Sequence, residues 1–298
     1  MNTVRDALVE AARILSSMET PFLDATLLLA HTLGISKEKL LASYPEELSL
    51  PAQNEFRAYL KKRLAGYPVS YIRQKKEFLG LPFYVDNRVL VPRPETETLV
   101  ELVLEYMDTK KAAESVETSG LADEGRAALR VLDIGTGSGC IAISIKYLRP
   151  EHEVTAADKS AAALKVCGMN ARHLLNEPLK MVHSDLFDKL SGRYDIIVSN
   201  PPYLTENEVK EMEERHWPEP RTALAAGEDG LDIIRLLIDE APAYLEDGGV
   251  LFMEAHIQQI ETIKTLLKAG GYTNIRAYRD LSGRDRVVSG RKPYAESD

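Results

Sequence analysis

The stretch RVLDIGTGSGCIAISIKYL, residues 130 to 148, decides the fold of this chain. It opens with a short apolar run typical of a buried strand and ends with a run long enough for a helix. Between them lie three glycines at alternate positions, Gly135, Gly137 and Gly139. Glycine lets the backbone turn tightly and approach a ligand, and the helix that follows directs its N-terminus at the same place. The stretch therefore predicts a strand, a ligand-binding turn and a helix.

The chain downstream of this stretch continues the alternation of strands and helices. Further strands are predicted at 153–158, 181–185, 194–200, 249–255, 274–280 and 285–291, and helices at 160–175, 231–244 and up to residue 267. Alternation of this kind is the signature of a doubly wound α/β fold with a mostly parallel sheet. The ligand edge of such a sheet lies at the carboxyl ends of its strands.

The chain upstream has a different pattern. Residues 1 to 66 predict several short helices, with Pro21 and Pro51 at helix starts and Gly34 and Gly66 after helix ends. The segments KEFLG, LPFYVD and VLV, between residues 76 and 91, predict short strands, and ETETLVELVLEYM predicts a helix ending at residue 107. Residues 108–127 are polar and poor in aromatic side chains, so we expect a flexible insertion there.

Composition and charge limit the classes of function. Of 298 residues, 44% are hydrophobic and 28% charged, as in ordinary folded soluble proteins. Residues 1–88 carry 12 Lys and Arg against 10 Asp and Glu, a net +2, which leaves 37 − 12 = 25 against 46 − 10 = 36, a net −11, for the remainder. Such a charge repels phosphate backbones. A basic cluster at 61–63, 73, 75 and 76 is either a solvated surface or a docking surface for a partner associated with nucleic acid.

Targeting and metal-binding signals are weak in this sequence. No run approaches the ~18 apolar residues of a membrane helix, and the amphipathic, acid-containing start does not resemble a signal peptide. We therefore expect a cytoplasmic protein that does not bind membranes. Cys140 and Cys167 are expected to be buried free thiols. The six histidines have no metal-ligand spacing, so we predict no metal site.

The glycine turn suits a nucleotide, and its spacing narrows the choice. Dinucleotide oxidoreductases use GxGxxG, whereas the pattern DxGxGxG resembles the first motif of methyltransferases that use S-adenosylmethionine. Asp158 ends the next strand, where a carboxylate can accept both ribose hydroxyl hydrogens, although an Asp there can also cap a helix. After the third strand, Asp185 can contact the amino group of adenine. For Leu186 and Phe187, an ordinary place in the core or the pocket wall is at least as well supported as a specific contact with the ligand.

The loop after the fourth predicted strand is Asn200-Pro201-Pro202-Tyr203. Proline fixes the backbone and has no N–H, so carbonyl oxygens are presented at a defined angle. The side-chain oxygen of Asn200 and the carbonyl of Pro201 can each accept one hydrogen of an NH2 group, while Tyr203 offers a flat face to a planar amide or base. An NH2 group held in this way is positioned for methyl transfer without a strong base.

Together these motifs resemble the HemK/PrmC family, the N5-glutamine methyltransferases that modify the GGQ glutamine of class I peptide chain release factors. The resemblance is carried by these strings: LVPRPETE (90–97), DIGTGSG (133–139), NPPY (200–203), EPRTAL (219–224), GEDGL (227–231) and DRVV (285–288). The sequence MEAH at 253–256 departs from it, because the family has a glycine after the ME pair.

The resemblance implies a fold, a cofactor and site residues. The fold is a class I methyltransferase with a Rossmann-like, doubly wound seven-stranded sheet at residues 93–298, a substrate-docking helical domain at 1–68 and a β-hairpin connector at 69–92. S-adenosyl-L-methionine would bind residues from three loops and leave as S-adenosyl-L-homocysteine; these residues are Gly135, Thr136, Gly137, Ser138, Gly139, Asp158, Asp185, Leu186 and Asn200. The glutamine would bind the catalytic residues Asn200, Pro201, Pro202 and Tyr203. We expect a monomer whose partner is the GGQ domain.

Three other functions share parts of this site. A DNA or RNA amino-methyltransferase would use the same NPPY loop for a flipped base, but the acidic catalytic half and the lack of a basic recognition module disfavour it. Methylation of a ribosomal-protein glutamine would need all the same features. A non-catalytic interaction protein that binds S-adenosylmethionine is disfavoured by the intact NPPY and glycine motifs.

Overall fold

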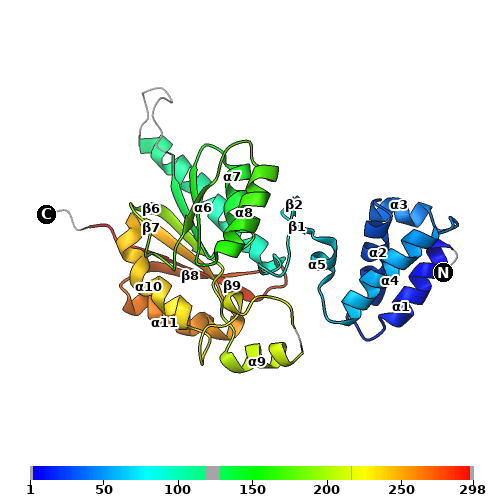
Figure 1. Cartoon of the computed structure of the whole chain (residues 1–298). Coiled ribbons are helices and arrows are strands. Elements are labelled where there is room, and N and C mark those ends of the chain that lie inside the picture. Colours follow the sequence, from blue (N-terminus) through cyan, green and yellow to red (C-terminus); the bar gives the residue numbers. More distant parts are fainter. Residues whose placement is uncertain (1–2, 118–127, 216, 296–298) are drawn as a thin grey trace. The chain divides into compact units, whose positions relative to one another are not determined.

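The computed structural model describes residues 3–117, 128–215 and 217–295. Backbone contacts divide the chain into two compact units, one formed mainly by residues 1–75 and one by most of the remainder. Short pieces at 85–87 and 211–218 group with the first unit. Figure 1 labels helices and strands of both units.

The first unit is helical. Its helices are α1 (Val4–Ile14), α2 (Pro21–Thr32), α3 (Lys37–Ala42), α4 (Leu50–Leu64) and α5 (Val69–Arg73). Side chains of Thr3, Ser36 and Ser49 accept backbone N–H groups at three helix starts, which satisfies donors that the helices leave free. Leu8, Leu28 and Phe56 are fully buried in its core. The prolines predicted at helix starts are confirmed: Pro21 is the first residue of α2, and Pro51 is the second residue of α4.

The second unit contains a small hairpin and a large sheet. Strands β1 (Lys76–Phe78) and β2 (Leu81–Phe83) pair antiparallel. The third strand expected here, VLV at 89–91, is wrong: these residues form an irregular segment between the hairpin and Pro92. The Val91 N–H donates to the Glu219 carboxylate instead, so it is not available to a strand ladder.

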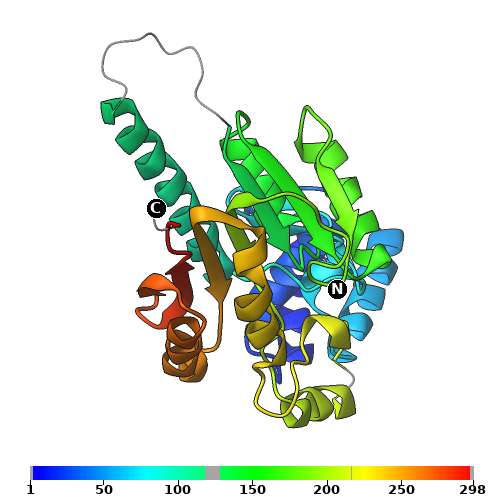
Figure 2. The same ribbon diagram turned by 90° about the vertical axis from the view of Figure 1, so that its left-hand side faces the viewer.

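The large sheet has seven strands in the order β5-β4-β3-β6-β7-β9-β8. Their bounds are β3 (Arg130–Ile134), β4 (Glu153–Asp158), β5 (Lys180–His183), β6 (Tyr194–Ser199), β7 (Leu245–Glu254), β8 (Thr273–Arg279) and β9 (Asp285–Arg291). β9 runs antiparallel to both of its neighbours, and the other pairings are parallel. β5 and β8 lie at opposite edges of the sheet (Figure 2). The predicted doubly wound fold is confirmed.

Helices cover both faces of this sheet. They are α6 (Glu95–Glu117), α7 (Cys140–Leu148), α8 (Ala161–Leu174), α10 (Asp232–Tyr244) and α11 (Ile260–Ala269), with α9 (Glu206–Glu214) and the 3₁₀ turns η1 (Arg221–Ala223) and η2 (Ile257–Gln259) in connections. Successive residues of β3 face different cores: Val131 packs with α6, α7 and α8, and Leu132 with α10 and α11. This alternation is the two-residue period of a strand.

Helix α6 is longer than the sequence pattern predicts. It continues to Glu117, so residues 108–117, expected in a flexible insertion, are helical. Alanine, lysine and glutamate dominate this stretch, and their high helix propensity outweighs the lack of an apolar stripe. The remainder of the expected insertion, 118–127, lies outside the described residues. No helix in the described parts of the chain is long and apolar enough to span a membrane.

Candidate active site

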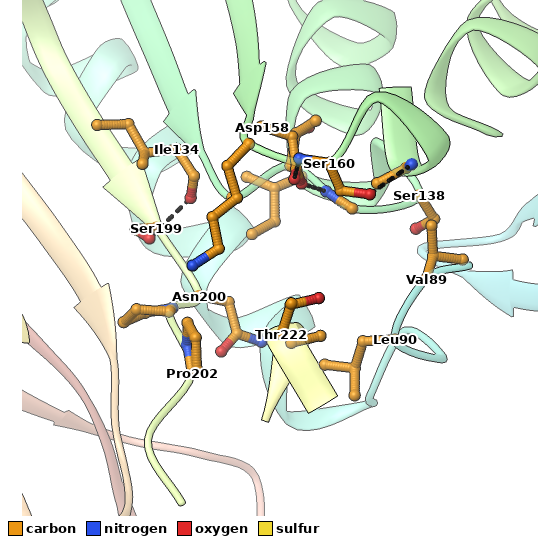
Figure 3. A pocket seen from close by; sticks show the side chains of 18 of the residues that line it. Val89, Leu90, Ile134, Ser138, Asp158, Ser160, Ser199, Asn200, Pro202 and Thr222 are labelled. Atoms are coloured by element: carbon orange, nitrogen blue, oxygen red, sulfur yellow. Dashed lines mark hydrogen bonds between the residues drawn. The ribbon is translucent and has the colours of Figure 1, made fainter. Parts of the chain in front are cut away.

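A pocket of about 1000 Å³, including its open mouth, lies at the carboxyl ends of β3, β4 and β6. The order of the strands reverses between β3 and β6, which is the place where open α/β sheets bind ligands. Ten predicted site residues line it: Gly135, Thr136, Gly137, Ser138, Asp158, Asp185, Leu186, Asn200, Pro201 and Pro202. Ser138, Asp158 and Ser160 face Asn200, Pro202 and Thr222 across this space (Figure 3).

The glycine loop combines an open surface with a tight packing contact. Gly135 and Thr136 donate their backbone N–H groups to the Ala157 carbonyl of β4, at 2.9 and 3.0 Å. A Cβ at Gly135 would meet nothing within 4 Å, so this glycine leaves its side of the pocket open. A Cβ at Gly139 would instead lie 2.6 Å from the Cδ1 atom of Ile143. Gly139 does not line the pocket and allows the packing at the start of α7.

Asp133 anchors the loop from below. Its buried carboxylate accepts the Thr136 hydroxyl at 2.6 Å and the Ala142 backbone N–H at 3.2 Å through one oxygen, Oδ2. The other oxygen, Oδ1, is buried without a hydrogen-bond partner. Burial raises the pKa of Asp133 to about 7, and its hydrogen bonds from Thr136 and Ala142 oppose that rise. Asp133 is the D of DxGxGxG, but sequence reasoning did not include it among the site residues.

Asp158 holds two loops and retains acceptor capacity for a ligand. One carboxylate oxygen accepts the N–H of Gly137 and the other that of Ser160, both at 2.8 Å. Ser160 caps α8 by accepting the Ala163 backbone N–H at its hydroxyl oxygen, so the capping role belongs to Ser160 and not to Asp158. A carboxylate has about four acceptor positions, and two remain for hydroxyl groups. Burial raises the pKa of Asp158, and the two backbone N–H groups counteract this.

The loop after β5 contributes one wall. Leu186 lines the pocket and has a backbone φ of +43°, a left-handed conformation that costs energy for a residue with a side chain. Phe187 is buried and stacks on Tyr244 with ring centres 4.6 Å apart. Leu186 is therefore a wall residue and Phe187 a core residue. Asp185, the preceding residue, is exposed and lines the mouth.

Asn200 follows β6 directly and is fixed to other elements of the pocket. Its predecessor Ser199 donates its hydroxyl to the Ile134 carbonyl at 2.7 Å, which joins the NPPY loop to the glycine loop. The Asn200 side chain donates from Nδ2 to the Thr96 hydroxyl oxygen at 3.1 Å. Thr96 in turn donates to the Glu254 carboxylate at 2.6 Å. Both partners are buried.

Tyr203 is the one NPPY residue that does not line this pocket. Its ring packs against the core on the α10 and α11 face. Its carbonyl accepts the Nε2 atom of Gln259 at 3.0 Å, and a Cβ on Gly230 would come within 2.3 Å of that carbonyl oxygen. Burial raises the pKa of Tyr203 to about 12, so the phenol stays protonated. The flat wall expected from Tyr203 lies beside this cavity and not in it.

His256, where the resemblance has a glycine, closes a capped turn. Its ring nitrogen accepts the Gln258 N–H at 3.4 Å, and its own N–H donates to the Gln259 side chain at 3.2 Å. Gln259 is the residue that holds the Tyr203 carbonyl. The substitution is therefore accommodated in the loop that supports NPPY.

Sequence reasoning missed a wall formed by two segments far apart in the chain. The pocket is also lined by Val89, Leu90, Pro92, Arg93, Thr96, Pro220, Thr222 and Ala223. Glu219 joins the two segments, because it accepts the Val91 N–H at 2.9 Å and the Arg93 guanidinium at 2.5 Å. The available signal was that all of these residues except Val89 occur in the LVPRPETE and EPRTAL strings.

Comparison with known proteins agrees with this architecture. Residues 118–216 match the model of the methyltransferase small domain, and residues 6–73 match that of the PrmC N-terminal domain. The solved 16S rRNA N2 G1207 methyltransferase of T. thermophilus, in complex with AdoMet and guanosine, has a TM-score of 0.50 at 19% identity, over 73% of this chain and 49% of that one. This likeness concerns the fold.

Two curated relatives match almost the full length. The release factor glutamine methyltransferase of Burkholderia pseudomallei is 37% identical over 98% of this chain and 100% of its own. The enzyme of the same name from Coxiella burnetii is 39% identical over 98% of this chain and 100% of its own. Identity at this level over whole chains confirms the resemblance seen in the motifs. The chain belongs to the family of release factor glutamine methyltransferases.

Proposed function

We propose that this protein transfers the methyl group of S-adenosylmethionine to the side-chain amide nitrogen (N5) of the GGQ glutamine of class I peptide chain release factors. The observation that carries the proposal is the position of Asn200 and Pro201 in the same pocket as the glycine loop. Membership of the family supports the substrate, and the acidic catalytic half supports a protein over a nucleic acid.

The residues of the pocket fit S-adenosylmethionine. The open backbone at Gly135 and the start of α7 suit a compact polar ligand, and the free acceptor positions of Asp158 suit ribose hydroxyls. Asp185 and Leu186 would lie at the adenine. When bound, this cofactor supplies a methyl group activated by a positively charged sulfur and leaves as S-adenosylhomocysteine.

Asn200 and Pro201 would hold the amide of the substrate. The Oδ1 atom of Asn200 and the Pro201 carbonyl each accept one hydrogen, which fixes the plane of the NH2 group and directs the nitrogen along one line. As positive charge builds on the nitrogen, these two acceptors stabilise it. The N–H bonds become more acidic at the same time, so a proton can leave to water without a strongly basic side chain.

The remaining parts of the chain are assigned on the same grounds. We assign the helical residues 1–68 to docking of the release factor, residues 69–92 to a connector and residues 93–298 to catalysis. A release factor is a translation protein, so the enzyme would act in the cytoplasm. One chain carries every residue used above, so a monomer would be sufficient for activity. Tyr203 would border the glutamine from outside the cofactor pocket.

Methylation assays on defined substrates test the function. The purified protein is incubated with labelled S-adenosylmethionine and a release factor, its GGA variant, ribosomal proteins or duplex DNA, and products are mapped by peptide mass spectrometry. We expect one methyl on the GGQ glutamine and none on the GGA variant or DNA. Label on ribosomal protein or DNA alone would contradict the proposed substrate, and no label despite cofactor binding would contradict catalysis.

A further inference from the structure

Two buried side chains and the half-buried Asn200 form a continuous line of hydrogen bonds that ends at the pocket. Glu254 closes β7, Thr96 lies in the first turn of α6 and Asn200 follows β6. Thr96 and Glu254 are each 1% exposed. The donor-to-acceptor distances are 3.1 Å from Asn200 to Thr96 and 2.6 Å from Thr96 to Glu254.

Such a line matters because a carboxamide has two ends of nearly equal shape and opposite hydrogen-bonding character. The oxygen accepts, and the NH2 group only donates. An Asn200 turned by half a rotation about its last bond would present NH2 to the NH2 group of the substrate, and neither could accept. The proposed reaction therefore needs one of two orientations that are almost equal sterically.

The chemistry of the line selects that orientation. An ionised carboxylate can only accept, so the single hydroxyl proton of Thr96 is committed to Glu254. The hydroxyl oxygen then offers a lone pair to Asn200, and only the Nδ2 end of Asn200 can use it. The Oδ1 end is left for the pocket.

We propose that Thr96 and Glu254 are positioning residues that orient the Asn200 carboxamide with its oxygen towards the substrate amide. This inference rests on the proposed function, because it assigns a task to the amide that accepts the glutamine. Neither residue needs to touch substrate or cofactor for this effect. Because the Glu254 carboxylate can only accept, it fixes the direction of the Thr96 hydroxyl, and the hydroxyl in turn fixes which end of Asn200 faces the pocket.

The protonation state of Glu254 should then control activity. Burial raises the pKa of Glu254 to about 7. The titratable and charged groups that interact with it in the described part of the chain are Arg93, Glu95, Cys140, Tyr203 and Arg286. The two arginines favour the ionised form and Glu95 opposes it. A protonated Glu254 can donate to Thr96, which frees the hydroxyl proton and permits the wrong orientation of Asn200.

The test compares variants that keep or remove the line. Thr96→Val removes the hydroxyl at constant shape, Thr96→Ser restores it, and Glu254→Gln removes the fixed acceptor. Thr265→Val is a matched control on α11, where the hydroxyl bonds only a carbonyl of its own helix. Measurements are kcat/KM for release factor over pH 6 to 9 and the Kd of S-adenosylmethionine by calorimetry.

We expect kcat/KM to fall about 10- to 100-fold in Thr96→Val and Glu254→Gln, the effect of one misplaced hydrogen-bonding group. Thr96→Ser should recover most of the activity that Thr96→Val loses, and cofactor Kd should stay within about threefold in all variants. In the wild type, kcat/KM should decline below about pH 7, and this decline should disappear in Thr96→Val and Glu254→Gln.

Each outcome decides the inference. Wild-type turnover of the GGQ glutamine with unchanged kcat/KM in Thr96→Val and Glu254→Gln would overturn it while leaving the proposed function intact. A wild type that methylates no glutamine would remove the proposed function, and this inference with it, before any variant is compared. If Glu254→Gln does not fold, the pH profiles of Thr96→Val and Thr96→Ser decide, since equal profiles would overturn the inference.

Discussion

Glu219 accepts the backbone N–H of Val91 at 2.9 Å, although 128 positions separate the two residues in the chain. The same carboxylate pairs with the guanidinium of Arg93 at 2.5 Å. One buried side chain thus fixes two segments that together form a wall of the pocket. Its side chain is fully buried, and the buried Val91 depends on it for a hydrogen-bond acceptor.

Replacement of Glu219 by alanine should therefore weaken the fold. The Val91 N–H loses its acceptor, and we expect a loss of about 1 to 3 kcal/mol in the free energy of unfolding. Chemical denaturation measures this loss. Glu261→Ala is the control, because its carboxylate is 81% exposed and pairs with Lys264 on the surface, where the expected change is below about 0.5 kcal/mol. Equal losses in both variants would contradict the assignment.

Asn200→Ala should abolish methyl transfer and spare cofactor binding. Removal of one acceptor that acts as charge develops costs about 10² to 10³ in kcat. Single-turnover assays measure the chemical step, and calorimetry measures the Kd of S-adenosylmethionine, which should change little. Unaltered turnover would contradict the role of the NPPY loop.

Asp158→Ala should act on the cofactor. Loss of a carboxylate that bonds two ribose hydroxyls would weaken S-adenosylmethionine by about 1 to 3 kcal/mol, or about 5- to 150-fold in Kd. Because Asp158 also accepts the N–H groups of Gly137 and Ser160, circular dichroism must first show a folded protein. An unchanged Kd in a folded variant would exclude the ribose contact.

Two glycine substitutions should separate the cost of a packing clash from the cost of backbone strain alone. Gly139→Ala places a Cβ 2.6 Å from Ile143 Cδ1 at a φ of +83°, so it should destabilise the fold by about 2 kcal/mol or more. Gly135→Ala meets no atom within 4 Å and should cost about 1 kcal/mol from its φ of +74° alone. Ile143→Val should partly rescue Gly139→Ala, because it removes the nearest clashing atom.

Asp133 should make stability depend on pH. Burial raises its pKa from 3.8 to about 7. Below pH 4 the carboxyl is protonated in both the folded and the unfolded state. Between about pH 4 and 7 the folded state binds the extra proton, so the contribution of Asp133 to stability falls as pH rises and is lowest above pH 7. Asp133→Asn should flatten this slope in thermal unfolding measured from pH 4 to 8; an unchanged slope would contradict it.

The positions of the strands could be predicted from the sequence more completely than the contacts that build the candidate site. Strands such as β3, β4 and β9 match their expected residues because strand composition and turn glycines agree locally. The wall at 88–94 is irregular, and nothing in VLV or PRP indicates that Glu219 will accept the Val91 N–H. Glu254 ends an apolar strand, but its bond to Thr96 depends on the packing of α6 against β7. Contacts between distant segments have no local pattern to reveal them.

The place of Glu254 in the chain has a consequence for biosynthesis. The glycine loop, the NPPY loop and the Thr96 segment are all synthesised before residue 204, yet the end of the hydrogen-bond line is the last residue of β7. That strand also pairs with β9, which ends at Arg291. A nascent or truncated chain that stops before residue 250 contains both recognisable motifs but lacks the acceptor that we propose to orient the Asn200 carboxamide. Such a fragment should be catalytically silent, which leaves activity to the finished polypeptide.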